Sequence, residues 1–351
     1  AEHRARGGKV HFRDRLLLQS FLENLPFEPT NAQLRTMAEI RDDLSSVHPM
    51  VRLLQGDVGA GKTLVAAGAI LMVVEAGFDA ALMAPTQILA EQHFLTFQQW
   101  FEPLGIEVKL KTGSKEAGGD LPLFSGKQPG HGTLLIGTHA LIHDDREFGN
   151  GLGLAVIDEQ HKFGVAQRQK LIQRGDSPDV LVMTATPIPR TLALAFYGDL
   201  DVSILDELPP GRGRIITGIR KTTQTKQASE FLKDKLAEGR QIYIVYPLIE
   251  ESEKSTAGAA SVEFEKWKEL LPGAHFALIH GRLSAQEKDE VMTRFRSGEA
   301  NVLVSTTVIE VGVDVPNANV MLIYNAERFG LAQLHQLRGR IGRGEHKSFC
   351  V

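Results

Sequence analysis

Short apolar segments alternate with amphipathic segments along the whole chain. This alternation is typical of parallel strands joined by crossover helices, and the almost continuous apolar character of the short segments indicates strands covered on both faces. The pattern therefore predicts an α/β fold with two mostly parallel sheets in series, each flanked by helices. The predicted strands cover residues 51–55, 80–84, 108–111, 133–137, 154–158 and 180–184, and then 241–246, 276–280, 302–306 and 320–325.

The segments between the predicted strands suggest how the chain is divided. Residues 205–214 contain two prolines and two glycines, which interrupt any helix or strand, and we predict a hinge between two domains there. We expect a linker or helical remnant at 1–25, with a helix near 13–25, a first domain at 26–208 and a second domain at 209–351. Residues 112–132 and 252–261, which are rich in small and polar residues, are predicted to be surface loops.

Length and composition agree with this division. The 351 residues are too many for one ordinary core and fit two domains, and 42% hydrophobic with 23% charged residues excludes a disordered or fibrous chain. Apolar runs are too short to span a bilayer, and the N-terminus is polar, so neither membrane insertion nor secretion is expected. The single cysteine, Cys350, rules out an intramolecular disulfide and a thiolate metal cluster, which indicates a reducing, cytoplasmic environment.

The charge is distributed unevenly along the chain. The first 210 residues hold 19 Lys and Arg against 26 Asp and Glu, whereas the remainder holds 20 against 17, for a net charge of −4. This is not the overall basic charge of a small nucleic-acid-binding module, so any polyanion must be bound by local groups.

The strongest chemical signal is GDVGAGKT at residues 56–63, which satisfies the pattern GxxxxGK[ST] between a predicted strand and a predicted helix. Glycines let the backbone curl so that its amides face phosphate oxygens, Lys62 would reach the β- and γ-phosphates, and Thr63 would offer its hydroxyl to Mg²⁺. The alternative, an accidental glycine-rich turn, is disfavoured by the flanking strand and helix. The predicted nucleotide-binding loop is Gly56, Asp57, Val58, Gly59, Ala60, Gly61, Lys62 and Thr63.

Two further motifs support a nucleotide site. In AVIDEQH (155–161), an apolar strand ends in two carboxylates, which suits Asp158 as a Mg²⁺ ligand and Glu159 as the base that takes a proton from the attacking water. A solvated loop would explain these two residues equally well if the P-loop were absent. In FEPTNAQ (27–33), Gln33 could bind the adenine edge and Phe27 could stack on the base, although Thr30 could instead cap a helix with Gln33 on its exposed face.

The ordered motifs resemble those of superfamily 2 helicases, and more narrowly those of the RecG family of bacterial DNA translocases. The wider set is GDVGAGKT, APTQILAEQH, GTHAL, DEQH, TATPIPRT, VSTTVIEVGVDVPNA and QLHQLRGRIGR; the narrower resemblance depends on DEQHKFG, TATPIPRTLA, LIEESE and IEVGVDVPNA. It covers essentially the whole chain. The transcription-repair coupling translocase is the alternative relative, because it shares TATPIPR, but DEQH favours RecG.

This resemblance implies a motor of two tandem RecA-like P-loop domains that hydrolyses ATP with Mg²⁺ and moves on duplex DNA, remodelling stalled forks and branched recombination intermediates. It implies branched or forked DNA and single-stranded DNA-binding protein as partners, a monomeric state and a bacterial cytoplasmic location. The RecG wedge domain and C-terminal segment would lie outside this sequence. A different class of function, a non-catalytic nucleotide sensor or DNA-binding module, is disfavoured because Lys62, Glu159 and Arg343 are all present.

The resemblance also assigns further residues. It implies nucleotide contacts at Gly312 and Asp314, and coupling of nucleotide state to DNA by Gln160, His161, Thr184, Thr186 and Gln336; polar capping at strand ends is the alternative. Arg340 and Arg343 match arginine-finger positions, where they would stabilise charge on the γ-phosphate, a contribution of roughly 4 to 7 kcal/mol in other P-loop enzymes. The alternative for these arginines is a basic surface helix.

Nucleic-acid contacts are predicted at strand-end loops, because hydroxyl, amide and backbone N–H donors suit phosphate oxygens and read no sequence. Polar residues are also common at strand ends for purely structural reasons. No zinc site is predicted, since no His/Cys cluster has ligand spacing. The predicted contacts are Pro85, Thr86 and Gln87; Gly137, Thr138 and His139; His280, Gly281 and Arg282; and Ser305, Thr306 and Thr307.

Overall fold

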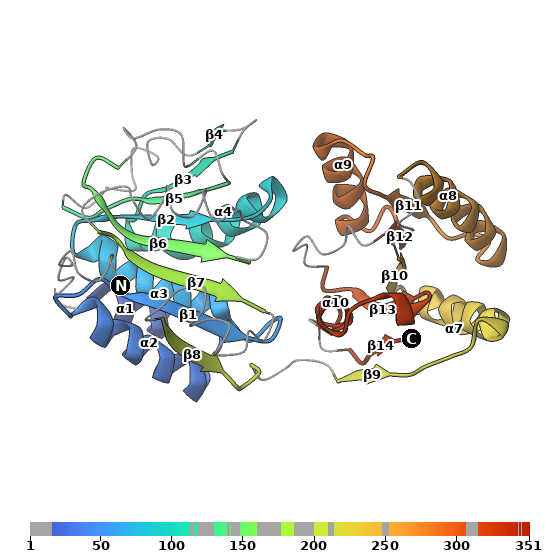
Figure 1. The fold of residues 1–351 in the computed structure, drawn as a ribbon, viewed down its shortest axis with the longest axis horizontal. Helices are drawn as coiled ribbons and strands as arrows, with labels where there is room; N and C mark the ends of the chain where they lie inside the picture. Colours follow the sequence, from blue (N-terminus) through green and yellow to red (C-terminus); the bar gives the residue numbers. More distant parts are fainter. Residues whose placement is uncertain are drawn as a thin grey trace. The chain divides into compact units, whose positions relative to one another are not determined.

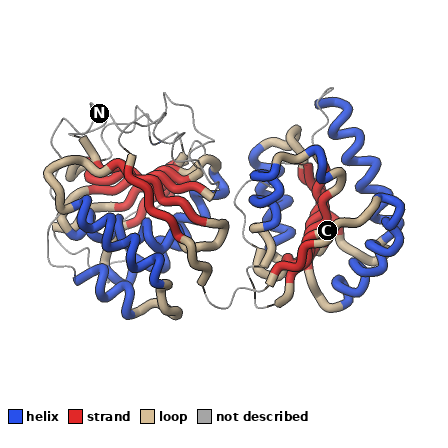
Figure 2. The backbone as a smooth tube through the Cα atoms, turned by 60° about the horizontal axis from the view of Figure 1, so that its bottom comes forward, coloured by secondary structure: helices blue, strands red, loops and turns tan. Residues whose placement is uncertain are grey.

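The computed structural model contains two α/β units, Ala1–Pro209 and Pro210–Val351 (Figure 1). It describes residues 16–112, 116–117, 130–138, 141, 148–159, 177–185, 200–209, 214–247, 253–306, 315–342, 344 and 346–351. Each unit is built on its own sheet. In Figure 2 the helices of the second unit lie on both sides of its sheet, whereas those described in the first unit gather mostly on one side.

The first unit contains a sheet whose strands run in the order β4-β3-β5-β2-β6-β7-β1-β8. Every neighbouring pair is parallel except β3 with β4. Parallel pairing places the carboxyl ends of these strands at one edge of the sheet. The strands are β1 Val51–Gly56, β2 Asp79–Met83, β3 Val108–Lys111, β4 Glu116–Ala117, β5 Leu134–Gly137, β6 Leu152–Asp158, β7 Asp179–Thr184 and β8 Asp201–Leu205.

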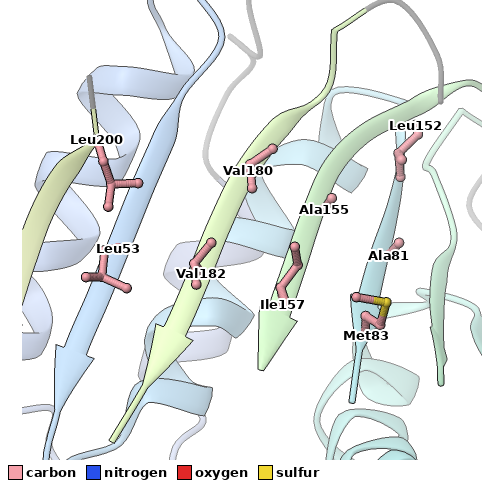
Figure 3. Packing of buried hydrophobic residues seen from close by; sticks show 9 residues of the cluster. All are labelled: Leu53, Ala81, Met83, Leu152, Ala155, Ile157, Val180, Val182 and Leu200. Atoms are coloured by element: carbon pink, nitrogen blue, oxygen red, sulfur yellow. The ribbon is translucent and has the colours of Figure 1, made fainter. Parts of the chain in front are cut away.

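Helices α1 (Leu16–Glu23), α2 (Asn31–Leu44), α3 (Lys62–Glu75) and α4 (Gln87–Phe101) belong to this unit, and the 3-10 turn η2 (Glu102–Leu104) follows α4. Helix α3 is apolar on all sides and contacts β1, β2 and β6. A cluster of buried apolar side chains lies on the opposite face of the sheet in Figure 3, so this sheet is covered on both faces, as predicted. The cluster contains Leu53, Ala81, Met83, Leu152, Ala155, Ile157, Val180, Val182 and Leu200.

The second unit has a sheet in the order β11-β12-β10-β13-β14-β9, in which every neighbouring pair is parallel. Trp267 and Ile244 are among the fully buried side chains of its core. The strands are β9 Ile215–Thr217, β10 Gln241–Tyr246, β11 Phe276–Ile279, β12 Val302–Thr306, β13 Ala318–Ile323 and β14 Ser348–Cys350. The helices are α7 Thr225–Ala237, α8 Glu253–Leu270, α9 Ala285–Arg296 and α10 Leu331–Arg338, with the 3-10 turns η6 Thr222–Gln224 and η8 Ala326–Arg328.

The structure confirms the α/β class with two parallel sheets, and each predicted strand is present within two residues at either end. The sequence pattern did not indicate the short strands β4, β8, β9 and β14. The surface loop predicted at 252–261 is wrong for residues 253–261, which form the start of α8. This segment contains Ala, Glu and Lys and no proline, so its small residues form a helix as readily as they would form a loop. The part of the chain that the structure describes includes no helix long and apolar enough to cross a membrane.

A partly buried ionic network connects β1 to α2 and β8. The Arg52 guanidinium on β1 donates to Asp43 Oδ2 (2.7 Å) and Glu39 Oε2 (3.2 Å) on α2, and to Ser203 Oγ (2.7 Å) on β8. The Arg52 side chain is 10% exposed, while those of Asp43 and Glu39 are 25% and 38% exposed. Strand β1 leads into the glycine-rich loop, so this network stabilises the strand that carries it.

We expect Arg52→Leu to lower the free energy of unfolding of the first unit by about 2 to 3 kcal/mol, because it leaves two partly buried carboxylates without their cation. Arg41→Leu is the matched control. Arg41 pairs with Asp42 on the surface and should contribute less than about 0.5 kcal/mol. Urea unfolding followed by circular dichroism measures both changes, and equal effects from the two variants would contradict this role for Arg52.

Candidate functional site: a phosphate-binding loop

The glycine-rich loop connects β1, which ends at Gly56, to α3, which begins at Lys62. Gly59 and Gly61 both have φ of 82°, a left-handed conformation that favours glycine. Gly61 is the N-cap of α3, and no side chain caps this end of the helix. The first amides of α3 are therefore not bound by a capping side chain, which is the arrangement that binds anions at a helix N-terminus.

Close packing also requires glycine in this loop. A β-carbon added at Gly61 would lie 2.2 Å from Gln33 Nε2, and one added at Gly56 would lie 2.9 Å from the β-carbon of Leu205. Val58 and Ala60 are buried, and the Asp57 carboxylate accepts a hydrogen bond from the Val58 amide (2.6 Å). The loop is thus held in shape by the protein around it.

Lys62 lies at the first position of α3 and extends back over the loop. Its ammonium donates to the carbonyl oxygens of Gly56 (2.8 Å) and Asp57 (3.0 Å). Thr63 follows it in the first turn of α3. The structure therefore places a cation and a hydroxyl-bearing residue at the helix end whose amides would receive phosphates.

Gln33 lies against this loop. It is 2% exposed; its Nε2 donates to the Ala60 carbonyl (2.9 Å), and its Oε1 accepts from the Thr30 amide (2.9 Å). Thr30 also caps α2, as in the alternative interpretation, but Gln33 is not on the exposed face that this interpretation assumed. Phe27 is 45% exposed in the segment between α1 and α2. Adenine recognition by these two residues stays a prediction.

Asp158 ends β6 and is nearly buried, at 9% exposed. The Nε2 atom of His93 on α4 lies within hydrogen-bonding distance of Asp158 Oδ2, at 2.9 Å. Burial raises the pKa of this carboxyl, but His93, the Lys62 ammonium and the Glu159 amide together outweigh burial and lower the pKa below its usual value. Asp158 is therefore ionised at neutral pH.

Glu159 follows directly and has φ of 47°, a left-handed conformation that is uncommon for a residue with a side chain. Such conformations cost of order 1 to 3 kcal/mol and cluster at active sites. On β7, between β6 and β1, Thr184 ends the strand and is buried. Parallel pairing thus brings Gly56, Asp158 and Thr184 to the same edge of the sheet. The other predicted coupling residues of this domain, Gln160, His161 and Thr186, lie outside the described residues.

The predicted nucleic-acid contacts of the first unit have local structural roles. Thr86 caps α4 by accepting from the Leu89 amide (3.4 Å), and Gln87 donates to Glu91 Oε1 (3.0 Å). A β-carbon at Gly137 would lie 2.0 Å from the Lys111 carbonyl oxygen, so close backbone approach requires glycine there. Pro85 precedes the cap, Thr138 is buried, and His139 lies outside the described residues.

In the second unit, residues 280–282 form the turn between β11 and α9, with Gly281 and Arg282 exposed. The pKa of His280 is lowered by partial burial and then by the positive charges of Arg282 and Lys288, which indicates a basic surface there. At the end of β12, Ser305 and Thr306 are fully buried, and the Ser305 hydroxyl donates to the Thr306 carbonyl. Their hydroxyls do not face solvent, and Thr307 lies outside the described residues.

Helix α10 carries the beginning of the arginine motif. Gln336 and Arg340 are each 7% exposed, whereas Arg338 is exposed. A basic surface helix therefore describes Arg338 but not Arg340. Arg343, Gly312 and Asp314 lie outside the described residues.

His93 is the site residue that the sequence analysis did not assign. The signal was available, because His93 is the last residue of APTQILAEQH, but nothing in the pattern paired it with a carboxylate 65 residues away. Within the described ranges, no group of three or more His, Cys, Asp or Glu side chains could hold a metal ion.

We expect Gly61→Ala to destabilise the first unit more than Gly298→Ala destabilises the second, by about 1 kcal/mol. Both glycines have φ near 80°, so both variants acquire left-handed strain, but a β-carbon at Gly298 meets no atom within 4 Å. At Gly61 the added β-carbon also displaces the Gln33 side-chain amide from its hydrogen bonds to the Ala60 carbonyl and the Thr30 amide. Urea unfolding monitored for each unit tests this, and equal destabilisation would show that Gln33 does not constrain the loop.

Comparison with known proteins places this geometry in a family. Residues 30–195 match the DEAD/DEAH box helicases, and residues 224–345 match the helicase conserved C-terminal domain. The ATP-dependent DNA helicase RecG of Synechocystis sp. is 52% identical over 337 residues, which are 95% of this chain and 40% of that protein. RecG of Escherichia coli O157:H7 is 51% identical over 340 residues, covering 95% of this chain and 49% of that protein. The chain thus spans somewhat less than half the length of these relatives.

Solved structures lead to the same family. A structure of RecG bound to a three-way DNA junction is 46% identical, with a TM-score of 0.80, and covers 100% of this chain and 46% of that one. Saccharomyces cerevisiae Dbp5 bound to RNA and ADP BeF3 is 19% identical, with a TM-score of 0.68, and the match covers 95% of this chain and 86% of the Dbp5 chain. At this identity the likeness shows the shared fold alone. With both helicase domains matched and about half of its residues identical to RecG proteins, the chain belongs to the RecG helicase family and consists of two tandem RecA-like domains.

Proposed function

We propose that the chain is an ATP-dependent DNA motor that moves along duplex DNA and thereby remodels branched DNA, such as stalled forks and recombination intermediates. The observation that carries the proposal is the phosphate-binding loop with an ionised Asp158 and a strained Glu159 at the same sheet edge. Relatives at 50 to 52% identity are named ATP-dependent DNA helicases, and one solved relative is bound to a three-way DNA junction.

The loop and α3 would hold the triphosphate of ATP. The uncapped amides at the start of α3 would bind phosphate oxygens, and Lys62 would exchange two backbone carbonyls for the β- and γ-phosphates, a stronger charge-assisted contact. Gln33 and Phe27 would contact the adenine. For Gln33 this requires that adenine replace at least one of the two hydrogen bonds that its side-chain amide now makes, to the Ala60 carbonyl and the Thr30 amide.

Thr63 and Asp158 have donor atoms suited to the Mg²⁺ that this fold family uses. A hydroxyl and an ionised carboxylate supply the hard oxygen ligands that Mg²⁺ prefers, and the lowered pKa keeps Asp158 in its ligating form. When bound there, Mg²⁺ would neutralise charge on the β- and γ-phosphates.

Glu159 would take the proton from the water that attacks the γ-phosphate. Its left-handed backbone conformation sets the direction in which its side chain leaves the end of β6. Arg340 and Arg343 would supply positive charge to the γ-phosphate from the second domain, so that hydrolysis requires both domains. Gly312 and Asp314 would add nucleotide contacts. Gln160, His161, Thr184, Thr186 and Gln336 would couple this chemistry to DNA.

DNA would lie along backbone amides, hydroxyls and basic side chains rather than base-reading groups. Pro85, Thr86 and Gln87 at the start of α4, with Gly137, Thr138 and His139, would contact it from the first domain. The second domain would contribute residues 280–282, where Arg282 is exposed and basic, and residues 305–307, where backbone groups would make the contact because the Ser305 and Thr306 hydroxyls are buried. Such contacts give sequence-independent, salt-sensitive binding, as movement along DNA requires. A single copy contains every group named, so the proposal needs no second subunit.

We expect Glu159→Gln to lower the kcat of ATP hydrolysis at least about 100-fold while ATP binding is retained, because the amide keeps the shape of the side chain but cannot accept the proton. Lys62→Ala should instead abolish nucleotide binding. Glu102→Gln, on the exposed turn η2, is the matched control and should leave the rate unchanged. Steady-state ATPase assays with forked DNA, together with equilibrium nucleotide binding, measure these effects.

The same ATPase assay, run with forked DNA, linear duplex DNA or RNA, tests which nucleic acid the chain acts on. Forked DNA should stimulate the wild-type chain more than linear duplex, and duplex DNA more than RNA. Absence of turnover with every nucleic acid would favour a nucleotide sensor, and strongest stimulation by RNA would contradict a DNA motor.

A further inference from the structure

His93 makes a buried contact that the proposed chemistry does not yet use. Its Nε2 lies 2.9 Å from Asp158 Oδ2, and the two residues are 8% and 9% exposed. An ionised carboxylate can only accept hydrogen bonds, so Nε2 carries the proton and donates it to Oδ2. His93 thus holds Oδ2, and the Glu159 backbone amide also hydrogen-bonds this carboxylate.

The position of His93 is set by the packing of α4. Thr86 caps the start of this helix, and its buried side chains include Phe94, Phe97 and Phe101. The His93 ring lies 6.2 Å from the Phe97 ring, and Phe97 packs edge-on against Phe101 at 5.2 Å. His93 is thus a polar residue on an otherwise largely apolar buried face, directed at the one carboxylate proposed to hold Mg²⁺.

We infer that His93 is a positioning residue for Asp158: it holds Oδ2 so that Oδ1 is presented to the metal, and it makes the orientation of this carboxylate depend on the position of α4. This inference rests on the proposed function, because Asp158 has a metal-holding role only there. Hydrogen-bonding partners of metal-ligating groups commonly change metal affinity 10- to 100-fold when they are removed.

The same contact connects the nucleotide to the DNA contacts. Helix α4 begins directly after Pro85 and Thr86, and β2, which leads into it, pairs in register with β6, Met83 opposite Ile157. The first turn of α4 and Asp158 therefore lie at the same sheet edge. A helix moves largely as a rigid body, so a DNA phosphate that shifts its first turn also shifts His93, one and a half to two turns further along. Because coupling between two binding sites is reciprocal, Mg²⁺–nucleotide should affect DNA affinity through the same bond.

Two substitutions of His93 separate the hydrogen bond from packing. In glutamine, Nε2 lies three bonds from the β-carbon, as Nε2 does in histidine, so His93→Gln keeps a donor at similar reach. His93→Leu fills similar space and has no donor. Phe97→Leu is the matched control, because it changes the packing of α4 one turn away and leaves the bond to Asp158 in place.

The measurement is equilibrium binding of a fluorescent ADP derivative, with Mg²⁺ and with EDTA, each with and without forked DNA. In Mg²⁺ we expect His93→Leu to weaken binding about tenfold, and His93→Gln and Phe97→Leu to stay within about threefold of wild type. In EDTA all three should stay within about twofold of wild type. The change in affinity that DNA causes in the wild-type chain should persist in His93→Gln and fall to less than half in His93→Leu.

The outcomes distinguish this inference from the proposed function. If the wild-type chain binds nucleotide independently of Lys62, the proposed function fails. If wild type behaves as proposed while His93→Leu matches Phe97→Leu, or loses equal affinity in EDTA, only the role of His93 fails. Urea unfolding checks that each variant is folded, and His93→Asn, whose amide is one bond shorter and should behave as leucine does, replaces His93→Leu if that variant does not fold.

Discussion

Parallel pairing in the first sheet is the constraint on which the nucleotide chemistry depends. In a parallel sheet all carboxyl ends lie at one edge, so the loop after β1, the carboxylates after β6 and the threonine that ends β7 meet there although they are far apart in sequence. The uncapped start of α3 lies at the same edge, because α3 continues directly from the loop after β1. That Lys62 and Asp158 lie at the same edge, although they are 96 residues apart in sequence, follows from this topology rather than from any local motif.

A second feature is the balance of charge at this edge. Burial alone would favour the neutral form of Asp158, and the His93 and Lys62 groups together with the Glu159 amide reverse that preference, so this buried acidic group stays ionised. Lys62 is itself held by two backbone carbonyls. The site therefore keeps its charges through fixed partners inside the protein, and a ligand that replaces some of these partners would change how the elements carrying them are held together. This is a physical basis for the proposed link between nucleotide binding and movement along DNA.

The sequence predicts the fold and the nucleotide loop well because both depend on local patterns. Apolar runs predict the central strands to within two residues, and GxxxxGK[ST] specifies Gly56, Gly61 and Lys62, the two glycines because close contacts and backbone conformation require them. The strands β4, β8, β9 and β14 were missed because they are short, at two to five residues, so no apolar run is long enough to indicate them. Residues 253–261 were misassigned because Ala, Ser and Lys suit both loops and helices, and long-range packing decides between them.

The long-range partners could not be predicted in the same way. His93 and Asp158 meet only because α4 and β6 are brought together by the strand order β5-β2-β6, and Gln33 packs against Gly61 only because α2 lies beside α3. Burial of Ser305, Thr306 and Arg340 likewise depends on how the second domain folds around them. Sequence spacing identifies such residues as polar and near a strand or helix end, but not which atoms they contact.

The most direct test of the central claim is a crystal structure of the chain with Mg²⁺, a non-hydrolysable ATP analogue and forked DNA. We predict that the triphosphate lies against the first amides of α3 and Lys62, and that Arg340 and Arg343 from the second domain reach the γ-phosphate. A triphosphate bound away from the loop, or both arginines directed away from it with nucleotide and DNA present, would contradict the account.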